Sequence, residues 1–283
     1  MSVEAANTTT QPVVKARKQV NKKLSTGQKI SLSTQDERTL RSVYEYLAGY
    51  AVRRSIESAL EAKKADVSRL HNALPPSSRL QLQMQPRSLQ ITSDRKSSKT
   101  GDNHTDDDDN THKSETDILL DEYYRAKDEL HKLEEKLKVH TSQDHKISFK
   151  DLDAVLRSLG PPFHRKQIEH MIWEVDENLD EMIDFDELQL TYYRNITDSS
   201  GSEPCYFFKI LEFLIFDASH KGYIIEDDCM EILYARYGGG YLEREMKLLF
   251  GSKLRAEGGD GTLNLESYLN SVLNRIGKRA LVF

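Results

Sequence analysis

Asp176-Glu-Asn-Leu-Asp-Glu-Met-Ile-Asp-Phe-Asp-Glu187 is the stretch on which the prediction of the fold rests. Counted as twelve positions, it carries oxygen-bearing side chains at positions 1, 3, 5, 9 and 12, and a residue that can offer its backbone carbonyl at position 7. These residues are Asp176, Asn178, Asp180, Asp184 and Glu187, with Met182 at position 7. A hard divalent cation takes about six to eight oxygen ligands. The spacing therefore predicts a loop that folds around such a cation.

The pattern is that of the EF-hand calcium loop. Ile183 at position 8 is the apolar residue expected in a short strand at the middle of the loop. Glu181 departs from the pattern, because position 6 is usually glycine and a non-glycine residue at positive φ costs roughly 1 kcal/mol. We therefore expect a calcium site that is weakened but not abolished. The alternative is an acidic, solvated loop without metal.

Four loops of this kind recur along the chain. Their apolar centres are Ile147, Ile183, Ile224 and Leu263, at spacings of 36, 41 and 39 residues. A helix, a twelve-residue loop and a second helix need about this many residues. The repeat predicts four helix-loop-helix units that pair two by two through their loops.

The third loop is a second, weaker metal candidate. Its ligands would be Asp217, Ser219, Tyr223 and Asp228. Gly222 stands correctly at position 6, but Lys221 brings a positive charge to position 5, and an Asp at position 12 reaches a cation less easily than Glu. Weak calcium binding, Mg²⁺ binding and no binding all remain open.

The first loop, from His140 to Asp151, is expected to hold no calcium. It begins with a histidine and contains Lys146, which are poor partners for a hard cation. A transition metal on His140 and His145 is the alternative, and it lacks a convergent third ligand.

The fourth loop is expected to be structural. Counting from Leu263 places Ala256 at position 1 and Ser267 at position 12, and neither is a good ligand. The preceding helix ends too early, which indicates five inserted residues within 251–259. We expect this loop to pair with the third through Ile224 and Leu263 without metal.

The N-terminal half divides into three segments. Residues 1–32 are polar and basic, and predict a disordered arm that is either merely solvated or in contact with an acidic partner. Residues 33–72 predict a long amphipathic helix, which Ser33 and Asp36 would cap; its apolar face carries Leu40, Val43, Tyr44, Leu47 and Ala51. Residues 73–116 predict a flexible acidic and polar linker, in which Asp106 to Asp109 form a solvated charge run.

Two further segments carry a family resemblance. Ser158-Leu-Gly160 with residues 168–187 is similar to the first-lobe linker, helix and second loop of calmodulin, and residues 213–228 are similar to its third EF-hand. The resemblance covers roughly 119–273. It implies an all-α fold of two EF-hand pairs, 117–197 and 204–283, with Asp176, Asn178, Asp180, Met182, Asp184 and Glu187 as calcium ligands. Residues 198–204 would join the pairs flexibly.

The general organisation, with Glu231-Ile-Leu-Tyr-Ala-Arg-Tyr237, also resembles EF-hand proteins built into the axonemes of ciliated and flagellated protists. That resemblance implies protein partners such as tubulin or axonemal proteins. Nucleic acid is an unfavoured partner, because the basic arm has no interleaved aromatic residues.

Composition bounds the function further. The chain has 283 residues, a formal net charge of −6 and two cysteines, with a mean hydropathy of −0.65. Cys205 and Cys229 give no disulfide framework and suit a reducing cytosol. The polar N-terminus has no signal peptide pattern, Ser2 excludes N-myristoylation, and no apolar run reaches 18 residues. We expect a cytoplasmic protein, associated with the cytoskeleton or flagellar axoneme, and no membrane partner.

The expected function is that of a calcium-binding, calmodulin-like adaptor or sensor within such an assembly. A metal-independent EF-hand scaffold and a regulatory subunit of an enzyme are the alternatives. The sequence has no phosphate-binding glycine loop, no nucleophile elbow and no clustered His and Cys, so we expect no catalysis. Whether the helix at 33–70 packs on the rest of the chain stays open.

Overall fold

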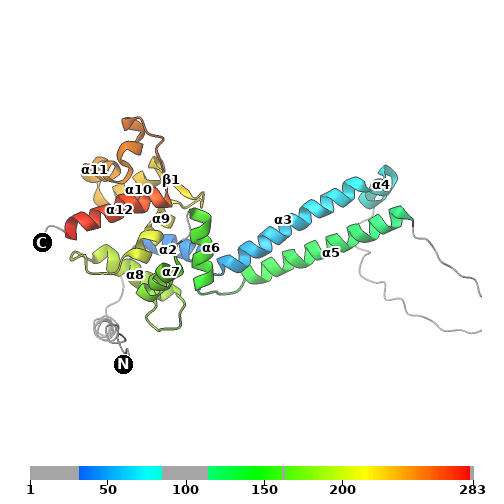
Figure 1. The fold of residues 1–283 in the computed structure, drawn as a ribbon, viewed down its shortest axis with the longest axis horizontal. Coiled ribbons are helices and arrows are strands. Elements are labelled where there is room, and N and C mark those ends of the chain that lie inside the picture. Colours follow the sequence, from blue (N-terminus) through cyan, green and yellow to red (C-terminus); the bar gives the residue numbers. More distant parts are fainter. Residues whose placement is uncertain (1–31, 85–113, 161–162, 281–283) are drawn as a thin grey trace, which may run out of the picture. The chain divides into compact units, whose positions relative to one another are not determined.

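The computed structural model describes residues 32–84, 114–160 and 163–280. They are mostly helical, as the sequence predicts, and form two compact units (Figure 1). Of the described residues, one unit contains those between Gly49 and His145, and the other combines those up to Ala48 with those from Lys146 onward. The predicted basic arm and the Asp106–Asp109 run lie outside the described residues. In the described part of the chain, no helix has both the length and the apolar character needed to cross a membrane.

The long helix expected at 33–72 is two helices, α2 (Thr34–Leu47) and α3 (Tyr50–Ala73). The break lies at Gly49, whose φ of 67° is a left-handed backbone conformation that residues other than glycine adopt only under strain. A Cβ at this position would also lie 2.7 Å from the ring of His140. The prediction missed the break because the apolar spacing continues across it. The predicted cap is present, since the Ser33 hydroxyl accepts the backbone N–H of Asp36 at 3.0 Å.

The unit from Gly49 to His145 is a helical hairpin. Helix α3 lies antiparallel beside α5 (Glu115–Thr141), and Lys63 pairs with Glu129 across them at 2.7 Å (Figure 1). A further helix, α4 (Pro76–Met84), occupies the start of the segment predicted as linker. Pro76 can begin a helix because the first helical position needs no backbone N–H donor. The guanidinium of Arg79 donates to the carbonyl of Leu74 at 2.7 Å and so secures the turn before it.

The other unit contains the predicted repeats. After α2 its elements are α6 (Phe149–Leu159), α7 (Arg165–Val175), α8 (Phe185–Thr197), α9 (Tyr206–Phe216), β1 (Tyr223–Ile225), α10 (Glu226–Tyr237), α11 (Gly239–Phe250), the 3₁₀ turns η1 (Gly251–Lys253) and η2 (Arg255–Glu257), β2 (Thr262–Asn264) and α12 (Leu265–Ala280).

Short antiparallel pairings join the loops. Strand β1 pairs with β2 so that Ile224 lies opposite Leu263, which is the pairing that the loop spacing predicts. Ile147 and Ile183 form an isolated antiparallel bridge and exchange two backbone N–H···O bonds of 2.9 Å. All four residues are buried. The loop centres therefore form part of the core.

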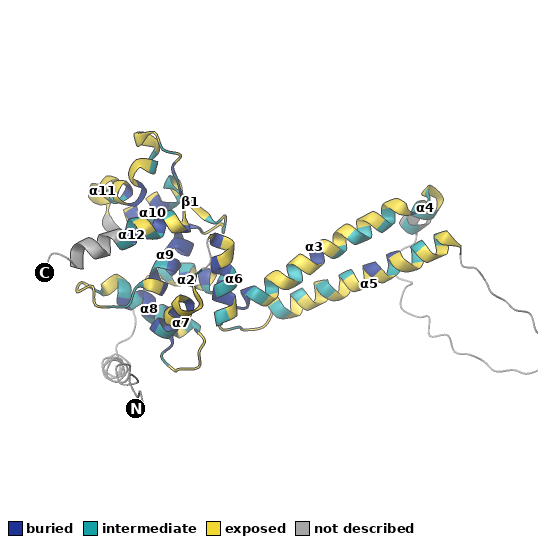
Figure 2. Cartoon of the chain, in the orientation of Figure 1, coloured by how far each residue is buried: buried dark blue, intermediate teal, exposed yellow. Residues whose placement is uncertain are grey.

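Helix α9 is the centre of this unit. Eight of its eleven residues are buried, between Phe207 and Phe216, and a helix with so much apolar surface must be surrounded by protein on most sides. It contacts α2, α7, α8, α10 and α12. Figure 2 shows that burial is concentrated in this unit, whereas α3 and α5 are mostly exposed or intermediate.

The segment predicted as a flexible connection, 198–204, is short and internally bonded. The carboxylate of Asp198 accepts the backbone N–H groups of Ser200 at 2.8 Å and Glu203 at 2.9 Å. These bonds and that of the Ser200 hydroxyl lower the pKa of Asp198 to about 2. The buried carboxylate of Glu174 in α7 accepts the N–H of Phe207 at 2.9 Å. The sequence left open whether the two halves pack together or swing, and in this unit they pack together, because α9 is buried against elements of both.

The sequence left open whether the predicted N-terminal helix packs on the rest of the chain, and its first part, helix α2, does so. It packs on α8 and α9 and buries Leu40, Val43 and Leu47. The guanidinium of Arg41 lies 3.8 Å from the ring centroid of Phe185, and the hydroxyl of Tyr192 donates to Asp36 at 3.1 Å.

Candidate metal-binding loops

The loop from Asp176 to Glu187 connects α7 to α8. Asp176 follows the last residue of α7, and Asp184 is the N-cap of α8. Asp184 accepts the N–H of Glu187 at 3.0 Å, and the carboxylate of Glu187 accepts the N–H of Asp184 at 2.9 Å, which makes a capping box. One pair of predicted ligands therefore also starts the helix that leaves the loop.

Asp176 organises the first half of the loop. One carboxylate oxygen accepts the N–H of Leu179 at 2.6 Å, and the other accepts the N–H of Glu181 at 2.9 Å. Glu181 has a φ of 64°, which is the positive value that the sequence predicts at position 6. Leu179 has a φ of 65°, and the sequence analysis missed this second strained position. The turn thus holds two side-chain-bearing residues in the left-handed region, at roughly 1–2 kcal/mol each.

Glu187 closes the loop from the other end. One of its carboxylate oxygens accepts the N–H groups of Glu177 at 3.0 Å and Asn178 at 3.1 Å. The residue is buried, and burial raises the pKa of its carboxyl above the ordinary value. The last predicted ligand thus points back across the loop to its first residues.

The middle of the loop is built from short local bonds. The Asn178 side-chain oxygen accepts the N–H of Asp180 at 2.8 Å, and the Asp180 carboxylate accepts the N–H of Met182 at 3.0 Å. Met182, whose predicted contribution is its carbonyl, precedes the paired Ile183. All six predicted residues therefore lie in one hydrogen-bonded loop.

Two cations that the sequence analysis did not assign to this loop contact it. The ammonium of Lys146, from the first loop, lies 2.5 Å from Asp180 Oδ2 and 3.5 Å from Asp184 Oδ2. Its hydrogen bond lowers the pKa of the Asp180 carboxyl. The buried guanidinium of Arg194, from α8, lies 2.5 Å from Glu177. The sequence did contain a sign that Lys146 lies near the second loop, because Lys146 directly precedes Ile147, the residue that pairs with Ile183.

The donor set of this loop fits a hard cation in its chemistry, because it consists of carboxylate, amide and carbonyl oxygens. The arrangement of these oxygens, in contrast, fits such a cation less well. Among the described residues, no group of three or more His, Cys, Asp or Glu side chains converges in a way that could hold a metal ion. The carboxylates of Asp176 and Glu187 bond to backbone N–H groups, and that of Asp180 bonds to Lys146. A bound ion would have to share the oxygens that accept N–H groups and compete with the ammonium of Lys146 for Asp180.

The third loop repeats the backbone of the second. Asp217 is fully buried, and its carboxylate accepts the N–H groups of Lys221 at 2.9 Å and Gly222 at 2.7 Å. His220 and Gly222, at positions 4 and 6, have positive φ. The ammonium of Lys221 lies 3.1 Å from the carboxylate of Asp228, the predicted ligand at position 12. Of the other two predicted ligands, Ser219 is exposed and Tyr223 begins β1.

The first and fourth loops contain other local structures. Ser148 and Asp151 form a capping box at the start of α6, so Asp151 at position 12 serves the helix. In the fourth loop the predicted insertion coincides with η1 and η2, and the ammonium of Lys253 donates to the hydroxyl of Ser267 at 3.1 Å.

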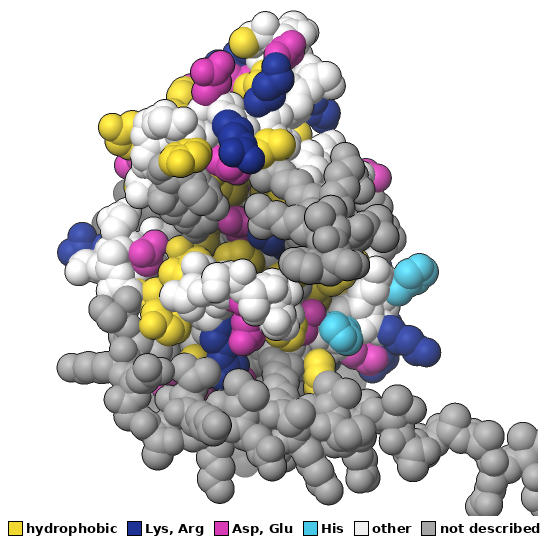
Figure 3. Space-filling view, turned by 90° about the vertical axis from the view of Figure 1, so that its left-hand side faces the viewer, with side chains coloured by type: hydrophobic (Ala, Val, Ile, Leu, Met, Phe, Trp, Pro, Cys, Tyr) yellow, Lys and Arg dark blue, Asp and Glu magenta, His cyan; other side chains and the backbone are white. Residues whose placement is uncertain are grey.

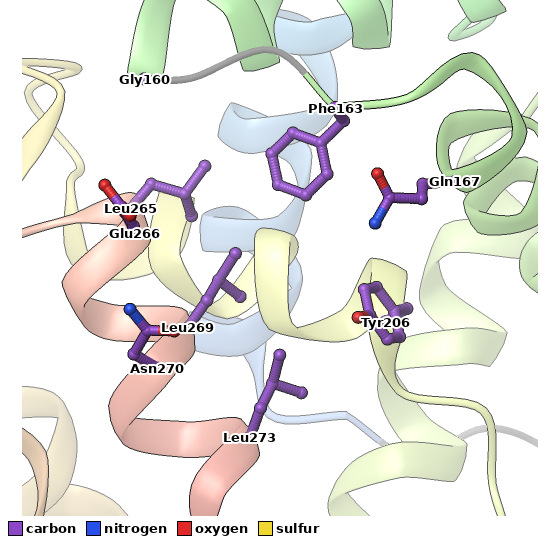
Figure 4. Close-up of a pocket in the computed structure, with 9 residues that line it drawn as sticks. All are labelled: Gly160, Phe163, Gln167, Tyr206, Leu265, Glu266, Leu269, Asn270 and Leu273. Atoms are coloured by element: carbon purple, nitrogen blue, oxygen red, sulfur yellow. The ribbon is translucent and has the colours of Figure 1, made fainter.

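A cavity of about 270 Å³ lies beside the loops, between α12, the start of α9 and the chain before α7. Phe163, Tyr206, Leu269 and Leu273 point toward its centre, and Gln167, Glu266 and Asn270 add polar groups to the lining (Figure 4). Figure 3 views the unit from the side on which α12 ends, where hydrophobic side chains gather in the middle of the face. The lining offers contact area rather than ligands for a metal.

No protein-family model matches the chain, and no curated protein matches it either.

Proposed function

We propose that the protein is a calcium-binding, calmodulin-like adaptor that works as a built-in part of a cytoskeletal assembly such as the axoneme. The observation that supports this most is the loop from Asp176 to Glu187. It combines the ligand spacing of an EF-hand with positive φ at position 6, a closing Glu187 and a strand-paired position 8. An ordinary acidic loop has no reason to combine these four features.

We infer that the two loop pairings belong to two EF-hand pairs. Ile147 with Ile183, and Ile224 with Leu263, are the contacts through which such loops pair. One good metal site among four loops suits a local modulator better than a switch with two independent lobes. The shared core around α9 agrees with this role, because it leaves the two halves no freedom to act separately.

Bound calcium would supply a divalent positive charge at the centre of the second loop. Asp176, Asn178, Asp180, Met182, Asp184 and Glu187 would hold it. Glu187 lies in the first turn of α8, and α8 packs on α2 and α9. A change in the position of its carboxylate therefore acts on the start of a helix that contacts the core.

Calorimetric titration of the full chain with calcium tests the proposal. We expect one site, with a dissociation constant in the sensor range of about 10⁻⁷ to 10⁻⁵ M or weaker. Glu187→Gln keeps the shape of the side chain and removes a ligand charge, so it should weaken binding at least about tenfold. Glu181→Gln, in the same loop but at a position that is no ligand, should change it by less than about threefold. Absence of calcium heat in the parent protein rejects the proposal.

A metal-independent scaffold is the second candidate, and the internal ion pairs favour it. Lys146 on Asp180 and Lys221 on Asp228 already neutralise carboxylates of both candidate loops. This function requires the same melting temperature and the same co-purifying proteins in calcium and in chelator. A tagged copy that fails to localise to the cytoskeleton would reject the assembly role in either version.

A further inference from the structure

The contact between Lys146 and the second loop joins two different repeats. Lys146 belongs to the first loop, whereas Asp180 and Asp184 are the ligands predicted at positions 5 and 9 of the second. The ammonium lies within 4 Å of both carboxylates, at 2.5 and 3.5 Å. It lies among the oxygen atoms with which calcium would have to bond.

The backbone holds Lys146 at this place. Its neighbour Ile147 is fully buried and exchanges two N–H···O bonds of 2.9 Å with Ile183. Ile183 in turn lies directly before Asp184. The lysine is therefore not a surface side chain that meets an acid by chance, because strand pairing brings its Cα to the loop edge.

The charges around the ammonium are unevenly distributed. Asp180 and Asp184 face it, Glu187 and Asp176 are bonded to backbone N–H groups, and Arg194 is bonded to Glu177. Lys146 is thus the cation that faces the carboxylates in the middle of the loop. We infer that Lys146 is a tethered counter-ion of the second loop, which neutralises Asp180 and Asp184 without metal and must leave when calcium binds.

The third loop contains the same device within its own sequence. Lys221 at position 5 reaches Asp228 at position 12, which is the carboxylate that a bound ion would need most. Two loops with different sequences thus bring an ammonium to a predicted ligand, one from the neighbouring loop and one from the same loop. The recurrence supports the view that these lysines regulate metal access.

This inference rests on the proposed function, because it concerns the affinity of the same loop for calcium. The charged form of Lys146 and a divalent ion repel each other at this distance, so only one of them can occupy the carboxylates. Lys146 sets a threshold: calcium binds only at concentrations high enough to displace it. Removal of the ammonium should therefore tighten calcium binding.

Lys146→Met in the full chain removes the charge and keeps an unbranched side chain that is shorter by one heavy atom. The side chain is 39% exposed, so the substitution opens no cavity. Lys150→Met is the matched control, because Lys150 is exposed and lies four residues further along. By calorimetry with calcium chloride, we expect Lys146→Met to bind about two- to fivefold more tightly than the parent and Lys150→Met less than about 1.5-fold more tightly.

Thermal unfolding of the same three proteins in chelator separates this inference from the proposed function. Without metal, Lys146→Met should melt below Lys150→Met, because Asp180 and Asp184 then repel each other. Equal affinity gains in the two variants would overturn the inference, since they indicate only a general charge effect. If none of the three proteins gives a heat signal on titration with calcium, the proposed function fails. The melting temperatures in chelator then still test the counter-ion role of Lys146. A lower melting temperature for Lys146→Met than for Lys150→Met supports that role, and equal temperatures overturn it.

Discussion

Asp176 and Asp217 begin their loops in the same way. Each carboxylate accepts the backbone N–H groups of positions 5 and 6, and in each loop positions 4 and 6 have positive φ. The third loop meets the requirement at position 6 with Gly222, whereas the second meets it with Glu181. The same backbone conformation thus forms with and without glycine at position 6, and the second loop carries the backbone strain at that position.

Glu181→Gly should therefore stabilise the protein. It relieves roughly 1–2 kcal/mol of left-handed strain, of which about 0.5–1 kcal/mol is lost to the greater freedom of glycine in the unfolded chain. We expect a net gain of about 0.5–1 kcal/mol in the free energy of unfolding, measured by urea denaturation in chelator. Asp186→Gly, five residues on and inside α8, should do the opposite by about 1 kcal/mol. A loss of stability with Glu181→Gly would show that φ at this position carries no strain.

At the scale of elements, the loops were predictable, and so was the start of α2 at Ser33, whereas the break between α2 and α3 was not. Ile183 and Ile224 could be placed at strand pairings because the repeat length and one apolar position in each loop are visible in the sequence. The break at Gly49 could not be predicted, because it depends on a left-handed turn and on the ring of His140, which is remote in sequence. Lys146 was seen only as a poor ligand for its own loop, because its partner Asp180 lies 34 residues away.

Gly49→Ala tests the turn between α2 and α3. A Cβ at this position would be held at positive φ and within 2.7 Å of the His140 ring, so we expect a loss of about 1–2 kcal/mol in the free energy of unfolding. Gly240→Ala is the control, because a Cβ at Gly240 in α11 meets no atom within 4 Å. It should leave stability unchanged or raise it by up to about 0.5 kcal/mol. Equal values for the two variants in chemical denaturation would contradict a specific role for Gly49.

At the scale of the whole molecule, helix α9 is the element that packs the repeats against one another. The polar segment 198–204 favours two independent halves when it is considered alone. Helix α9, which begins two residues later, buries eight of its eleven residues, and such a helix cannot face solvent between two mobile lobes. Its burial against α2, α7, α8, α10 and α12 makes one core of both halves.

Leu211→Ala should therefore destabilise both halves together. Leu211 is fully buried in α9, and removal of a buried leucine side chain costs about 2–5 kcal/mol.

Trp173, the only tryptophan of the chain, lies in α7 and reports by fluorescence on the first half, while far-UV circular dichroism reports on all helices. We expect the urea midpoints from both probes to fall by the same amount. Leu248→Ala in α11, where the side chain is 44% exposed, should lower the free energy of unfolding by less than about 1 kcal/mol. A shift in circular dichroism without a shift in Trp173 fluorescence would mean that the halves unfold separately. In that case α9 belongs to the second half alone, and the loop before α8 cannot act on the core through it.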